Sequence, residues 1–126
     1  IFGHNAQFPQ ILNGFGIQTA TLFRGIGDFP KDMFKWVSPD GSMVLTHKLC
    51  ADRTYSNFYF AIRWPFDETG YEKEQVLAKT RELLEREVDR AVSENILMMD
   101  GVDHIEIEPE LNHILDMIQN GIDNVE

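Results

Sequence analysis

The sequence predicts an α/β fold with a parallel sheet, because helices and strands alternate along the chain. A short helix over residues 5–14 is followed by an apolar, β-branched strand over 17–24. An amphipathic helix over 72–93 is followed by a short apolar strand over 95–99, and a last helix comes after it. This order is typical of α/β proteins, whose active sites lie where parallel strands end.

Local signals support the first helix and strand. Asn5 lies near the expected N-cap, and Gly14 and Gly16 follow the helical repeat as a stop. The strand that comes next is apolar enough to be buried, and it ends at Arg24 before a glycine-containing loop. We therefore expect Arg24 at a position where α/β proteins place functional groups.

A β-hairpin is predicted in the first half of the chain. Residues 34–37 and 43–47 flank a Pro-Asp-Gly-Ser sequence, which favours a tight turn. The aromatic-rich stretch over 55–64 fits either an extended or a mixed conformation. The hairpin would then be an insertion between the two helix–strand pairs.

The strongest periodic signal is the helix over 72–93, which carries one apolar stripe opposite a face rich in Glu, Arg and Lys. The stripe consists of Val76, Leu77, Thr80, Leu83, Leu84, Val88, Ala91 and Val92. The strand over 95–99 ends in the run Asp100-Gly101-Val102-Asp103-His104. The last helix, predicted over 108–119, has its apolar residues on one face. These residues are Leu111, Ile114, Leu115 and Ile118.

Composition places the chain among ordinary globular proteins. Its 126 residues, of which 43% are hydrophobic, suffice for a single α/β domain over 1–126. The net charge of −10 argues against a nucleic-acid partner, since phosphate binding needs clustered Lys and Arg. No apolar run approaches the roughly 20 residues that cross a bilayer, so no membrane partner is expected. The single cysteine, Cys50, fits a reducing compartment and favours a cytoplasmic location.

The two strand ends carry the residues with the clearest chemistry. Asp103, beside apolar neighbours, could have a raised pKa and act as a general acid. Alternatively, Asp103 caps the following turn and His104 is a surface residue. Arg24 could hold a carboxylate in a bidentate pair, or form a structural ion pair at the mouth of a loop. His4 could contact a ligand or satisfy backbone groups at a turn.

No metal site or phosphate-binding loop is predicted from the residues alone. The four histidines are not spaced as a ligand cluster, and His47 with Cys50 makes an incomplete pair. The run Arg24-Gly25-Ile26-Gly27 lacks the glycine spacing and the Lys of a phosphate-binding loop. We therefore assign no metal ligand within this chain.

Ordered motifs along the whole chain resemble the catalytic domain of family 38 α-mannosidases of the bacterial and cytosolic type. Their common order makes the resemblance more specific than any one motif. In the first part of the chain the motifs are Phe2-Gly3-His4, Gln7-Phe8-Pro9-Gln10-Ile11-Leu12, Gly14-Phe15-Gly16-Ile17 and Phe23-Arg24-Gly25. Further along they are Phe34-Lys35-Trp36, Ser38-Pro39-Asp40-Gly41-Ser42, Val44-Leu45, Gly101-Val102-Asp103-His104 and the helix from Pro109.

The resemblance implies a partial seven-stranded parallel α/β barrel from a retaining exo-α-mannosidase that binds zinc. By position in these motifs, Asp103 would be the acid/base residue and Arg24 would contact the nucleophilic carboxylate. Phe2 would lie against the sugar, with His4 and His104 as further substrate-binding residues. The implied substrate is a terminal α-mannoside of an oligosaccharide or glycan.

The same resemblance implies that parts of the site lie outside residues 1–126. The nucleophilic Asp would directly precede Ile1, and the zinc ligands would lie upstream and downstream of the chain. We therefore expect a piece of a larger catalytic domain that is inactive by itself and does not bind zinc tightly. A partial barrel leaves strand edges unpaired, which favours homo-oligomers.

Two other interpretations stay open. The chain could be a non-catalytic α/β module that binds a sugar or protein partner through exposed aromatic residues. Those residues are Phe58, Tyr59, Phe60, Trp64 and Phe66. It could also be a degenerate glycosidase that kept sugar binding and lost hydrolysis. The residue encoded just before Ile1 separates these interpretations, because the enzyme requires Asp there.

Overall fold

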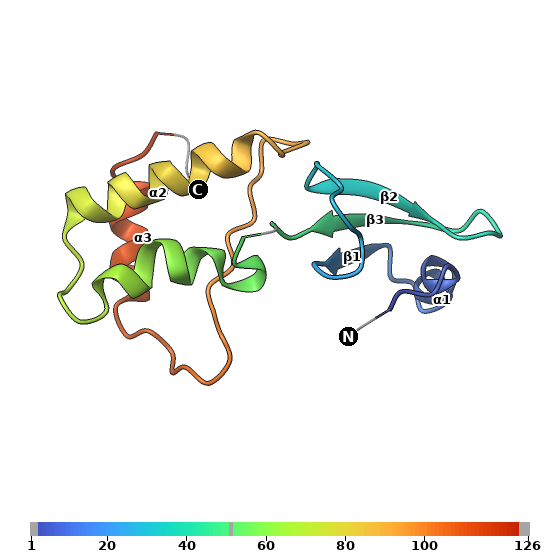
Figure 1. Cartoon of the computed structure of the whole chain (residues 1–126), viewed down its shortest axis with the longest axis horizontal. Helices are drawn as coiled ribbons and strands as arrows, with labels where there is room; N and C mark the ends of the chain where they lie inside the picture. The colour runs from blue at the N-terminus through green and yellow to red at the C-terminus, as the bar shows by residue number, and fades with distance from the viewer. Residues whose placement is uncertain (1–2, 51, 124–126) are drawn as a thin grey trace. The chain divides into compact units, whose positions relative to one another are not determined.

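A computed structural model describes residues 3–50 and 52–123, and the chain divides into two compact units (Figure 1). We call them the sheet unit and the helical unit. The sheet unit comprises residues 1–51 and 90–95, and the helical unit comprises residues 52–89 and 96–126. The presence of a sheet together with helices confirms the predicted α/β class.

The sheet unit contains a three-stranded mixed sheet. β1 (Thr19–Leu22) pairs in parallel with the central strand β3 (Met43–Lys48), and β2 (Met33–Val37) pairs with β3 in the antiparallel sense. The hairpin turn forces β2 and β3 to be antiparallel, whereas the chain between β1 and β3 is long enough to cross back. The sheet is therefore mixed and not wholly parallel as predicted. The seven-stranded barrel stays a prediction.

The turn of the hairpin is built from the residues that predicted it. Ser38 donates its backbone N–H to the Ser42 carbonyl at 2.8 Å. Ser42 donates from its backbone N and its Oγ to the two carboxylate oxygens of Asp40, at 3.0 and 2.7 Å, and these bonds lower the pKa of Asp40. Gly41 has a φ of 88°, which side-chain-bearing residues rarely adopt. The predicted hairpin is thus confirmed down to its turn.

The first helix, α1 (Phe8–Gly14), packs against β3 and ends where the sequence predicts. The backbone N–H of Gln10 donates to Ser38 Oγ at 3.0 Å, which ties the helix to the hairpin turn. Before the helix, Asn5 Oδ1 accepts the backbone N–H of Gln7 at 2.8 Å. This bond satisfies a backbone group in the turn that leads into α1, as an Asn at such a position commonly does.

The described part of the helical unit contains two α-helices, α2 (Lys73–Val88) and α3 (Leu111–Gln119), and three short helical turns. The turns are η1 (Thr54–Ser56), the π-helix η2 (Tyr59–Arg63) and η3 (Trp64–Phe66). The aromatic stretch over 55–64 is therefore helical and not extended. No helix in the described ranges is long and apolar enough to cross a membrane.

The core of the helical unit combines α2, α3 and the chain around η2. Its buried residues are Phe58, Ile62, Val76, Leu83, Ile114, Met117 and Ile118. Phe58 and Ile62 lie four residues apart, so the helical conformation turns both toward the core. Phe58 is only 3% exposed, so it is not part of an exposed aromatic interface, whereas Trp64 is 55% exposed.

The helix α2 ends at Val88, five residues before the predicted end at 93. Val88 and Val92 are 59% and 58% exposed, so the apolar stripe does not continue onto a buried face there. Just after the helix, the Arg90 carbonyl accepts the backbone N–H of Asp32 at 2.9 Å. The early end of α2 could not be predicted from periodicity alone, because periodicity does not show whether an apolar residue packs against another part of the protein.

Residues 95–99, predicted as a strand, contain no strand in the structure. The Met99 backbone N–H donates to Asn57 Oδ1 at 2.7 Å, and the Met99 carbonyl accepts the Phe58 N–H at 3.0 Å. The segment therefore hydrogen-bonds to the chain that leads into η2. A short apolar run is compatible with a strand or with a buried loop. Here the hydrogen bonds to Asn57 and Phe58 hold the segment as a loop.

Candidate functional site

Arg24 lies in the exposed loop that follows β1, beside His4. The His4 Nε2–H donates to the backbone carbonyl of Arg24 at 2.6 Å. The His4 ring also meets the Trp36 ring edge-on, with their centroids 5.6 Å apart. The structure thus brings together two of the predicted site residues. It also shows that His4 satisfies a backbone group, as one of its two interpretations proposed.

Gly25 allows His4 to approach this loop. Its φ is +81°, and a Cβ at this position would lie 3.0 Å from Cδ2 of the His4 ring. A larger residue would therefore meet both an unfavourable backbone conformation and a close contact. The backbone conformation and the contact with His4 therefore explain why glycine follows Arg24.

A surface hollow of about 380 Å³ in the sheet unit contains both His4 and Arg24. The residues that line it are His4, Phe8, Leu12, Thr19, Ala20, Thr21, Leu22, Phe23 and Arg24. Mainly apolar walls with a few polar groups are typical of sites for small ligands. Phe2, predicted to contact the sugar, lies outside the described residues.

Asp103 and His104 form a turn within residues 100–108 of the helical unit, which we call the Asp103 loop. Both residues are exposed. His104 has a φ of 68°, in the left-handed region that residues other than glycine seldom adopt. The apolar neighbours of Asp103 in the sequence therefore do not bury it within this unit.

Arg63, which is only 5% exposed, binds both ends of the Asp103 loop. Its Nη1 donates to the two carboxylate oxygens of Asp100 at 3.0 and 2.8 Å, and its Nη2 donates to Glu108 Oε2 at 3.2 Å. Burial disfavours the charged guanidinium, but the Asp100 carboxylate and the hydrogen bonds outweigh it and raise the pKa of Arg63. One side chain thus joins two carboxylates that lie 37 and 45 residues further along the chain.

Tyr71 adds a second link to the same loop. Its hydroxyl lies 2.8 Å from Glu108 Oε2 and 2.8 Å from Asp67 Oδ1. The single hydroxyl proton can be donated to either carboxylate. Burial first, and then hydrogen bonding to Asp67 and Glu108, raises the pKa of Tyr71, so the hydroxyl stays protonated. The hydrogen bond from the Glu110 backbone N–H lowers the pKa of Glu108. Burial raises this pKa, but Tyr71 and Arg63 lower it further, so the net change is downward. Glu108 is therefore an ionised acceptor at neutral pH.

Arg63, Tyr71 and Glu108 were not among the site residues predicted from the sequence. One signal was present, because Arg63 is the single charged residue in the apolar and aromatic run Tyr59–Phe66. A charge inside such a run predicts a buried group that must be paired. Its partners were not readable, since they lie in a segment without regular secondary structure.

No group of three or more His, Cys, Asp or Glu side chains within residues 3–50 and 52–123 is close enough to hold a metal ion. A zinc ion takes four ligands, or three protein ligands and a water molecule. The zinc that the family resemblance implies therefore does not fit this part of the chain by itself.

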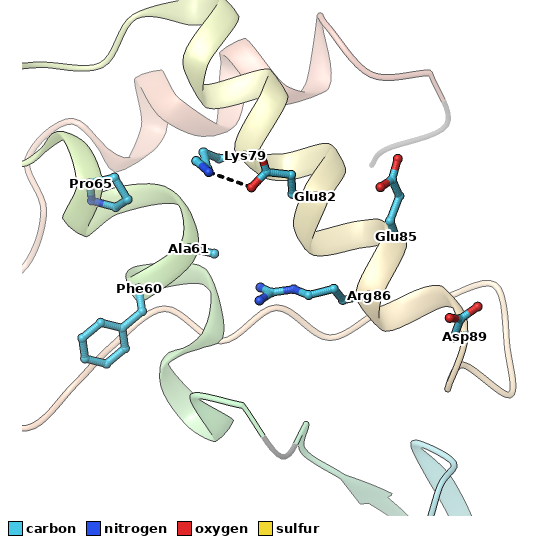
Figure 2. Close-up of a pocket in the computed structure, with 8 residues that line it drawn as sticks. All are labelled: Phe60, Ala61, Pro65, Lys79, Glu82, Glu85, Arg86 and Asp89. Atoms are coloured by element: carbon cyan, nitrogen blue, oxygen red, sulfur yellow. Dashed lines mark hydrogen bonds and ion pairs between the residues drawn. The ribbon is translucent and has the colours of Figure 1, made fainter.

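A larger hollow of about 590 Å³ lies in the helical unit, between α2 and the turns η2 and η3 (Figure 2). Its residues are Phe60, Ala61, Pro65, Lys79, Glu82, Glu85, Arg86 and Asp89. The Lys79 ammonium pairs with Glu82 Oε2 at 2.7 Å, and Arg86 Nη1 pairs with Asp52 Oδ2 at 3.2 Å. Of these eight residues only Phe60 was named from the sequence, as one of the aromatic residues of the alternative partner-binding interpretation.

A comparison with known families decides what kind of domain carries these loops. The model of the glycosyl hydrolases family 38 N-terminal domain matches residues 1–124. The chain belongs to glycosyl hydrolase family 38. The match includes both the His4–Arg24 region and the Asp103 loop, and it confirms the family that the sequence motifs suggested.

A curated relative of this family 38 chain is Alpha-mannosidase G from Dictyostelium discoideum. The two sequences are 42% identical over 60 residues. The aligned region covers 44% of this chain and 5% of the relative, so the chain spans only a small part of that protein's length. No solved structure matches the chain.

Proposed function

We propose that the chain is part of the catalytic domain of a retaining exo-α-mannosidase, which hydrolyses terminal α-mannosides of oligosaccharides or glycans. The observation that carries the proposal is the family 38 match over residues 1–124. The similarity to Alpha-mannosidase G supports mannose as the sugar.

In this proposal Asp103 is the acid/base residue. Its carboxyl group protonates the glycosidic oxygen as the bond to the anomeric carbon breaks, and a nucleophilic carboxylate from outside this chain bonds to that carbon. The Asp103 carboxylate then takes a proton from the water molecule that displaces the nucleophile and releases mannose. The exposure of Asp103 at a turn supports this role, because its proton must reach a substrate outside the helical unit.

Arg24 would keep the nucleophilic carboxylate ionised, since a guanidinium favours the charged form of a nearby carboxyl group. Its place in an exposed loop after β1, beside His4, supports this role. Phe2, His4 and His104 would contact the sugar. The nucleophile and the zinc ligands would come from outside residues 1–126, so this chain alone would not catalyse hydrolysis.

Hydrolysis of aryl α-mannosides by the full-length protein tests the proposal. The wild type is compared with Asp103→Asn, each with and without a chelator, over a series of leaving groups. We expect chelator-sensitive activity that falls about 10²–10⁴-fold in the variant, the range that general acid–base catalysis contributes. The loss should be greatest for poor leaving groups, which need protonation most. Asp116→Asn, at an exposed position of α3, is the matched control and should keep full activity.

Two results would contradict the proposal at different levels. A full-length protein that hydrolyses no mannoside would overturn the enzymatic proposal and leave a module that binds a sugar or protein partner. An active protein that is indifferent to Asp103→Asn would keep the family activity and place the acid/base role on another carboxyl group.

A further inference from the structure

We propose that Arg63 is a positioning residue for catalysis, because it holds the two ends of the Asp103 loop and so determines where Asp103 lies. The inference rests on the proposed function, in which Asp103 transfers the proton. Arg63 acts through Asp100 and Glu108, and the geometry assigns it no contact with Asp103 itself.

The first observation is that the loop has little regular structure of its own. Residues 100–108 contain a turn at Asp103 and His104 but no helix or strand, and Figure 1 shows a long loop that leads into α3. Asp100 and Glu108 are its first and last residues, and both bind the same guanidinium. Arg63 therefore closes the loop at its base.

The second observation is the short distance along the chain from the clamp to the proposed acid. Asp103 follows Asp100 by three residues, which reach about 10 Å at most when fully extended. Asp103 therefore cannot lie further than this from the part of the backbone that Arg63 holds through Asp100. In enzymes generally, a misplacement of about 1 Å can reduce the rate roughly 10²-fold.

The third observation is the balance of charge in the cluster. Arg63 is the cation that faces the carboxylates of Asp100 and Glu108, and Tyr71 links Glu108 to a third carboxylate, Asp67. Removing the guanidinium would leave these carboxylates to repel one another next to the apolar core. Removing one partner of a buried ion pair is also strongly unfavourable because it leaves the other charge uncompensated. The loop would then move away from its present position.

The test uses the full-length protein with Arg63→Gln, Asp100→Asn and Tyr71→Phe. Arg63→Gln removes the charge at the centre, and Asp100→Asn removes the charge of one of its two paired carboxylates. Tyr71→Phe removes only a hydroxyl and keeps both ion pairs, so it carries the test if the other two variants do not fold. Arg86→Gln is the matched control, because Arg86 is an exposed arginine of the same unit that also pairs with a carboxylate.

The readout is kcat/KM for aryl α-mannosides whose leaving groups range from good to poor, because kcat/KM reports the first step, in which the leaving group departs. If Arg63 positions the acid, the variants lose up to roughly 10²-fold on poor leaving groups and little on good ones, which depart without protonation. A merely structural role would lower kcat/KM by one common factor for all leaving groups, through loss of folded enzyme.

The outcomes separate this inference from the proposed function. If Asp103→Asn shows the dependence on leaving group and the Arg63, Asp100 and Tyr71 variants do not, the positioning role is overturned and the acid/base assignment stands. If Asp103→Asn itself shows no such dependence, the proposed function fails at its acid/base residue, and the inference falls with it.

Discussion

Replacing Gly121 by alanine should destabilise the helical unit, which carries the Asp103 loop. Gly121 comes just after α3, at a place where glycine usually serves a left-handed φ. Here its φ is not positive, and the residue is small for a different reason. A Cβ would lie 2.5 and 2.6 Å from the two methyl groups of Leu77 on α2, and 2.9 Å from the Met117 carbonyl oxygen.

The size of the effect follows from these distances. Ordinary contact begins at 3.4 Å, so the Leu77 methyl groups would have to move by about 0.9 Å. Leu77 is 4% exposed, and the Met117 oxygen belongs to the backbone of α3, so neither can give way freely. Overpacking of this kind costs about 1–3 kcal/mol. Each kcal/mol should lower the melting temperature by about 4–8 °C in a unit of this size.

Urea unfolding of the wild type and Gly121→Ala measures the cost. Gly14→Ala is the matched control, because Gly14 has helical φ and no atom within 4 Å of a new Cβ, so its stability should be unchanged or slightly raised. In the double variant Gly121→Ala/Leu77→Ala, the loss of unfolding free energy should be smaller than the sum of the losses in the two single variants, because alanine at position 77 leaves space for the new Cβ. A Gly121→Ala protein as stable as the wild type would refute the close packing of α2 on the segment after α3.

Two further predictions concern stability. Thr46 is fully buried and its Oγ1 has no hydrogen-bond partner among the described residues, so Thr46→Val should raise the free energy of unfolding by about 1 kcal/mol. A loss of stability in the same urea assay would show that this hydroxyl is bonded after all. The stabilisation from Glu108, whose pKa is lowered on folding, should be present above pH 4.5 and lost as the pH falls through the folded value. The stabilisation from Tyr71, whose pKa is raised on folding, should be present below pH 10.0 and lost as the pH rises through the pKa of the folded state. The free energy of unfolding, measured as a function of pH, should therefore fall at both low and high pH. Glu108→Gln should make the fall at low pH smaller, and an unchanged fall at low pH would contradict the role of Glu108.

The sequence by itself determined the parts of the protein that depend on neighbours along the chain. The hairpin was readable from Pro39-Asp40-Gly41-Ser42, because the turn is closed by bonds among these few residues. The helices α1, α2 and α3 were readable from apolar spacing, although α1 and α3 begin three residues later than predicted and α2 ends five residues earlier. The family was readable from ordered motifs, and the match over residues 1–124 confirms it.

Only the tertiary structure decided which distant groups meet. Arg63 was a conspicuous charge in an apolar run, but its partners Asp100 and Glu108 lie in a loop with no period to read. Residues 95–99 have the composition of a strand, yet the Asn57 side chain and the Phe58 backbone take the Met99 hydrogen bonds. The physical reason is the same in both cases. A buried charge and an unpaired backbone group each require a partner, and the chemistry of the group does not specify where along the chain that partner lies.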